Sequence, residues 1–84
     1  MVTPASIEQS IAAGLACEHL SVSGDGAHFE ALIVSPAFAG QSRVRRHQLV
    51  YAALGDRMRE EVHALSMTTL TPEEWVAQRS APRG

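Results

Sequence analysis

The stretch that most constrains the fold runs from residue 62 to residue 75, because a strand pattern leads there directly into a helix start. Over residues 62–69 the chain changes from helical spacing to an alternation of two faces. His63 stands at the entry of this segment, directly after a long helical pattern. The alternation predicts a strand over 63–69 that is the last strand of a small sheet.

A helix start follows this strand without a loop. Thr71 has the position of an N-cap, Pro72 that of the first helical residue, and Glu74 completes a capping box three residues after the cap. Leu70 and Trp75 flank the box as a hydrophobic staple. We therefore expect Trp75 to be substantially buried at the start of the final helix.

The N-terminal half predicts one helix and a β-hairpin. Thr3 and Pro4 begin a helical pattern that continues to Cys17, which we interpret as a small half-buried thiol. Alternating residues predict strands over 19–24 and 27–35, joined by a short turn rich in glycine.

A second, longer helix is predicted from Ser42, as N-cap, to about residue 61. A loop after the second strand precedes it and carries one buried anchor, Phe38. Gly55 is a point where the helix bends or divides. The predicted apolar stripe consists of Val44, Leu54 and Met58, with either Val50 or Tyr51.

These elements give the order α-β-β-α-β-α in a single α+β domain over residues 1–84, with about 77–84 as a fraying tail. A right-handed crossover through the long helix makes the third strand parallel to the second. The sequence thus predicts a three-stranded mixed sheet with helices packed on one face. This order resembles that of RNA-binding KH domains, but the G-x-x-G clamp of those domains is missing.

Composition and motifs exclude several function classes. The net charge of −2 provides no broad basic field for nucleic acid or anionic lipid. No nucleophile–base motif or phosphate-binding glycine loop is present, so we expect no enzyme activity. A single cysteine excludes an internal disulfide, and no apolar run predicts a membrane span, so we expect a cytoplasmic protein.

Four cationic or titratable residues crowd the first turn of the long helix, against the helix dipole. One interpretation is a solvated face whose arginine stems cover apolar surface, and the other is a docking patch for an acidic partner or nucleic acid. Both interpretations place the side chains in solvent. The residues of this basic helix start are Arg43, Arg45, Arg46 and His47.

His63 and His28 are the candidate metal ligands. A lone histidine at a strand start is most simply a structural residue, and two imidazoles are too few to hold a metal alone. Incomplete ligand sets are, however, typical of shared sites, in which a partner supplies the remaining ligands. Mixed imidazole and thiolate ligation is sound chemistry for a [2Fe-2S] cluster.

Four segments together resemble the BolA-like family, and in the short hairpin turn they resemble its small acid-stress bacterial branch. They are Ser-Gly-Asp-Gly-Ala-His-Phe-Glu at 23–30, Arg-Val-Arg-Arg-His-Gln-Leu-Val-Tyr at 43–51, Val-His-Ala-Leu-Ser at 62–66 and Thr-Pro-Glu-Glu-Trp at 71–75. The resemblance covers nearly the whole chain and implies a class-II-KH-like fold.

The resemblance also implies a function, as partner of a monothiol glutaredoxin with which the chain shares a glutathione-bound [2Fe-2S] cluster. It makes His63 the ligand from this chain, which is expected to be a monomer without cofactor when alone. The family's second ligand comes from the loop between the first two strands, so here that role falls to His28, less readily to Asp25, or is vacant. The alternative that the family implies is a DNA-binding transcriptional regulator of stress and morphology genes, with weak binding through the basic helix start.

Overall fold

The computed structural model describes residues 3–25, 28–55 and 65–80. Part of the predicted long helix (56–61) and the first residues of the predicted third strand, with His63, lie outside these ranges. The described elements are α1 (Pro4–Gly14), β1 (His19–Gly24), β2 (Phe29–Val34), the short 3-10 helix η1 (Pro36–Phe38), α2 (Arg43–Leu54), β3 (Leu65–Leu70) and α4 (Pro72–Ser80). Their order confirms the predicted α-β-β-α-β-α arrangement.

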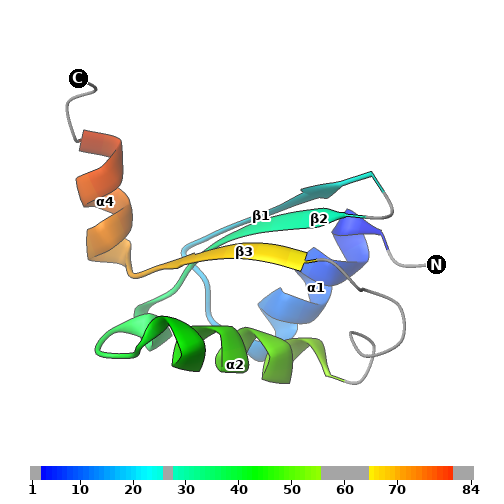
Figure 1. The fold of residues 1–84 in the computed structure, drawn as a ribbon, viewed down its shortest axis with the longest axis horizontal. Coiled ribbons are helices and arrows are strands. Elements are labelled where there is room, and N and C mark those ends of the chain that lie inside the picture. Colours follow the sequence, from blue (N-terminus) through cyan, green and yellow to red (C-terminus); the bar gives the residue numbers. More distant parts are fainter. Residues whose placement is uncertain (1–2, 26–27, 56–64, 81–84) are drawn as a thin grey trace.

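The three strands form one mixed sheet in the order β1-β2-β3 (Figure 1). β1 and β2 pair antiparallel, with Leu20 opposite Ile33. β2 and β3 pair parallel, with Ala31 opposite Met67. The parallel pair confirms the predicted crossover, since the chain returns from the end of β2 to the level at which β2 begins before it enters β3.

The helices α1 and α2 lie together beneath one face of the sheet, whereas α4 stands at the far end of β3, outside that layer (Figure 1). Buried side chains from the sheet and from both helices meet in the intervening layer. This core contains Ile7, Ile11, Phe29, Ala31, Ile33, Phe38, Val50 and Leu54. The predicted anchor Phe38 is confirmed, since it is completely buried.

The apolar stripe of α2 differs from the prediction at one position. Val50 and Leu54, four residues apart, face the core, while Val44 is 67% exposed and Tyr51 is 45% exposed. Residues six apart lie about 120° apart around a helix, so Val44 cannot share the face of Val50. The prediction for Val44 was therefore wrong, and Met58 lies outside the described residues.

The start of α2 and the start of α4 have the N-cap residues that the sequence predicts. Ser42 Oγ accepts the backbone N–H of Arg45 at 3.2 Å, which confirms Ser42 as the N-cap of α2. In α4 the Glu74 N–H donates to Thr71 Oγ1 at 3.1 Å and the Thr71 N–H donates to Glu74 Oε1 at 2.8 Å. The predicted capping box of the last helix is thus present in both directions.

Candidate functional site

His28 lies at the end of the sheet where the described part of β3 begins. The next residue, Phe29, pairs with Leu65 across the parallel ladder. The His28 N–H donates to Asp25 Oδ1 at 2.9 Å, and the Asp25 N–H donates to the His28 carbonyl at 3.2 Å. These two bonds join Asp25 to the backbone of His28, while the His28 side chain is exposed.

His63, the other predicted ligand, lies outside the described residues and precedes Leu65 by two positions in sequence. The structure therefore does not test whether it meets His28. In the ranges that the structure describes, no group of three or more His, Cys, Asp or Glu residues could hold a metal ion. The ligand pair remains a prediction.

Cys17 has the structural role that the sequence predicts. The thiol is half-buried, and its Sγ donates to the Leu15 carbonyl at 3.3 Å. Burial raises the pKa of the Cys17 thiol, so it stays protonated where a ligand would have to be a thiolate.

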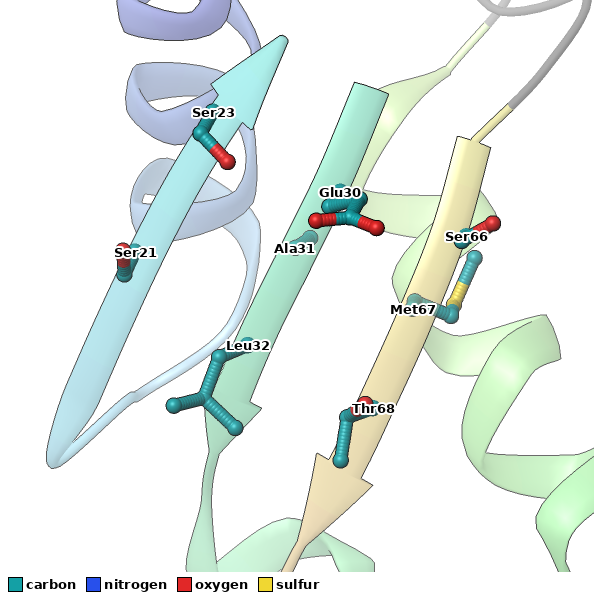
Figure 2. A pocket seen from close by; sticks show the side chains of 8 residues that line it. All are labelled: Ser21, Ser23, Glu30, Ala31, Leu32, Ser66, Met67 and Thr68. Atoms are coloured by element: carbon teal, nitrogen blue, oxygen red, sulfur yellow. The ribbon is translucent and has the colours of Figure 1, made fainter. Parts of the chain in front are cut away.

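The sheet face away from α1 and α2 carries a shallow hollow of about 360 Å³ (Figure 2). Glu30 stands near its centre, opposite Ser23 on β1 and Ser66 on β3. Ser21, Leu32 and Thr68 line the rest of the same face. A carboxylate among hydroxyl groups does not suit an anion, so this face is distinct in charge from the basic helix start.

The basic helix start divides into three environments. Arg43 and Arg45 are exposed, and His47 is half-buried. Arg46 was predicted to be solvated, and this was wrong, because only 14% of its side chain is exposed. The four side chains therefore do not form one solvated patch.

The guanidinium of Arg46 joins α2, β3 and α4. Its Nη1 lies 2.7 Å from Glu74 Oε1, and its Nη2 lies 3.3 Å from Oε2. Nε donates to the Gln41 carbonyl at 2.9 Å and Nη1 to the Thr69 carbonyl at 3.0 Å, while the group lies 6.0 Å from the centre of the Phe38 ring. Arg46 thus holds the start of α2 against the start of α4.

Glu74 is the other half of this contact. Its hydrogen bond with Arg46, together with the bond from the Thr71 N–H, lowers the pKa of Glu74 to about 2. The capping-box residue therefore also serves as the ion-pair partner of a distant helix. The sequence held one signal of this contact, namely arginines at a helix start where the dipole disfavours them.

Trp75 packs on the sheet through His19, which lies at the opposite end of the sheet from His28. The two rings stack with centroids 5.0 Å apart, and Arg79 lies 5.5 Å from the Trp75 ring. Trp75 is half-buried, which is less than the sequence predicted. The cause is the position of α4, the helix that carries Trp75, which stands at the far end of β3 and not over the face of the sheet where the core lies (Figure 1).

The mixed β1-β2-β3 sheet with this helix order defines a class-II-KH-like α+β domain. A family model described as BolA-like protein matches residues 7–74, and the chain belongs to the BolA-like family. No described helix is both long and apolar enough to cross a membrane.

Known proteins of this family resemble the chain over most of its length. Acid stress protein IbaG of Escherichia coli strain K12 is 36% identical over 74 residues, which cover 87% of this chain and 88% of that protein. The DNA-binding transcriptional regulator BolA of Haemophilus influenzae is 42% identical over 60 residues, covering 71% and 58%. The structure of a BolA homologue from Coxiella burnetii superposes with a TM-score of 0.80 at 48% identity, covering 90% of this chain and 99% of that one.

Proposed function

We propose that the chain is a cytoplasmic partner of a monothiol glutaredoxin, with which it shares a glutathione-bound [2Fe-2S] cluster in iron–sulfur trafficking or in iron and stress regulation. The observation that carries this proposal is membership of the BolA-like family over residues 7–74. His63 lies within that range, in the Val-His-Ala-Leu motif on which the resemblance rests.

In this proposal His63 is the ligand from this chain, and His28 is the candidate for a second. His28 is exposed, and its backbone is bonded to Asp25 by one side-chain and one backbone hydrogen bond, which fits a side chain offered to a partner. A partner has to supply the remaining ligands, and thiolates are the usual ones for this cluster. The cluster would provide the electronic and redox chemistry, and this chain would orient one or two imidazoles.

The test is anaerobic co-purification of the full chain with a monothiol glutaredoxin and glutathione, followed by visible absorption and circular dichroism. His63→Ala should leave a folded chain whose complex has an altered spectrum and loses its cluster faster. His28→Ala should give a weaker version of the same change. His19→Phe is the control, because it removes an imidazole at the opposite end of the sheet and keeps a ring against Trp75.

Two outcomes would count against the proposal. If the wild-type chain forms no coloured complex, the shared cluster is wrong. If the His63→Ala complex equals wild type in spectrum, lifetime and acid sensitivity, the ligand assignment is wrong. Acid sensitivity is informative because an imidazole must be neutral to bind iron.

DNA binding is the second candidate function, favoured by two exposed arginines at one helix start and by the name of the Haemophilus influenzae relative. With Arg46 held by Glu74, Arg43 and Arg45 leave about two phosphate contacts. The expected slope of log K against log salt is therefore roughly −1.8. Duplex titrations at several salt concentrations measure it, and submicromolar binding at physiological salt would favour this function over the first.

A further inference from the structure

A groove runs along the outer edge of β3, and His28 is not among the described residues that line it. Its volume is about 360 Å³, and its described walls come from α2, β3 and α4. We name it the β3-edge groove; its lining residues are Arg43, His47, Met67, Thr68, Thr69, Leu70 and Gln78. In Figure 1 it corresponds to the side of β3 that faces away from β2.

Backbone groups of β3 point into this groove. The Leu70 carbonyl accepts the Ser35 N–H at 2.9 Å, so Leu70 directs its backbone groups toward the β2 side. Directions alternate along a strand, so Met67 and Thr69 direct theirs outward. Arg46 reaches the Thr69 carbonyl from that outer side, which agrees with this assignment.

Three of these outward groups have no partner among the described residues. They are the Met67 N–H, the Met67 carbonyl and the Thr69 N–H. An edge with free donors and acceptors is a template for another extended chain. The spacing matches strand pairing in either direction, because both directions use alternate residues of the edge strand.

The positive charge of the groove favours an extended chain that carries acidic side chains. Arg43 and His47 are one helical turn apart and line the same wall, next to the positive end of the α2 dipole. No acidic side chain is among the described residues that line the groove. An incoming strand with a carboxylate at this point therefore complements the charge of the groove, and a strand with a lysine or arginine there does not.

We propose that the β3-edge groove binds an extended acidic segment of a partner protein, which adds to β3 as a further strand and places a carboxylate beside Arg43 and His47. The groove has no Phe, Tyr or Trp side chain for base stacking among its described residues, and the imidazole of His47 is its single aromatic ring there, which disfavours a nucleic-acid strand. A second copy of β3 would bring methionine and threonine side chains but no carboxylate. The inference rests on the proposed action through a protein partner and does not require the cluster.

The probe is an acetylated and amidated heptapeptide, T-V-E-V-E-V-T, titrated into the full-length ¹⁵N-labelled chain. The amide resonances of Met67 and Thr69 should shift and become protected from exchange, while those of β1, the opposite edge, stay in place. A matched T-V-K-V-K-V-T peptide should bind more weakly. N-methylation of the peptide at alternate residues should abolish binding in one register and spare it in the other, because only alternate N–H groups face β3.

Charge reversal tests the wall of α2. Arg43→Glu should weaken binding of the acidic peptide about five- to tenfold. The fold should survive, because Arg43 is exposed and a glutamate at a helix start suits the dipole. Arg45→Glu is the matched control: it makes the same change in net charge two residues away, outside the groove, and should leave the affinity nearly unchanged.

Several results would overturn the inference. These are no shift of Met67 and Thr69 at about 1 mM peptide, equal effects of the two arginine variants, or tighter binding of a single-stranded oligonucleotide to the same amides. Concentration-dependent dimerisation of the chain that protects β3 would also overturn it. If Arg43→Glu leaves peptide binding unchanged while His63→Ala still alters the cluster complex, the groove inference fails and the proposed function stands.

Discussion

Replacing Arg46 with alanine tests whether this side chain holds the start of α2 against the end of β3 and the start of α4. The variant removes the donors that reach the Gln41 and Thr69 carbonyls and the cation paired with Glu74. Two hydrogen bonds from a charged donor in a side chain that is 14% exposed contribute about 3 kcal/mol together. For a domain of this size that loss lowers Tm by about 15 °C.

The assay is urea and thermal unfolding followed both by far-ultraviolet circular dichroism and by tryptophan fluorescence. Trp75 is the single tryptophan and lies in α4, so fluorescence reports on the helix that Arg46 anchors. Arg45→Ala is the control. The side chain of this exposed neighbour bonds only to Gln48 among the described residues, so the substitution should cost less than about 0.5 kcal/mol.

Arg46→Lys refines the same test. A lysine keeps the charge but has no planar fork for Glu74, and its three donors lie on one nitrogen, whereas Arg46 reaches the two carbonyls from separate nitrogens, so lysine should recover only part of the loss. If Arg46→Ala unfolds at the same urea concentration as Arg45→Ala, then the observed bonds contribute nothing to stability. Full recovery by lysine would mean that charge alone matters.

Three further substitutions test separate features of the fold. Wild type should exceed Glu74→Gln in Tm at neutral pH. Because the folded-state pKa of Glu74 is lowered, this gap should close as pH falls from about 4.5 to about 2, and a constant gap would contradict the ion pair. Trp75→Ala should cost about 2 kcal/mol in urea unfolding, less than for a fully buried tryptophan, and a negligible cost would contradict the stacking on His19. Gly14→Ala should lower Tm although alanine favours helix, because its Cβ would lie 2.8 Å from Ala53 Cβ and 2.9 Å from Ala53 Cα; a higher Tm would show that α1 and α2 separate without cost.

Local signals made the element order predictable. The caps at Thr3, Ser42 and Thr71 depend on neighbours within three residues, and each is present with its hydrogen bond. The strands follow from period-two spacing, and the parallel pairing follows from the crossover rule. The family resemblance rests on the same kind of local information, in four short segments, and the match over 7–74 confirms it.

Contacts between distant elements were not predictable in this way. Glycine disfavours a helix in general, yet the missing Cβ of Gly14 is what lets α1 approach Ala53 of α2. Trp75 looked like a buried staple, yet the placement of α4 leaves it half-buried on His19. Each outcome depends on where a second element lies, and helix propensity and spacing carry no information about that.

The basic helix start shows how tertiary contacts separate residues that the sequence presents as one group. Arg46 fits neither interpretation, because its side chain is largely buried and bonded to Glu74 and to two backbone carbonyls. The docking interpretation applies to the side chains that make no such bonds. Two of these differ in position, because Arg43 lines the β3-edge groove and Arg45 does not. Of the two exposed arginines, a partner strand in the groove therefore uses only Arg43, whereas a DNA backbone laid across the helix start would use both. The pair of single charge reversals consequently distinguishes a protein partner from DNA, whatever the sequence of either ligand.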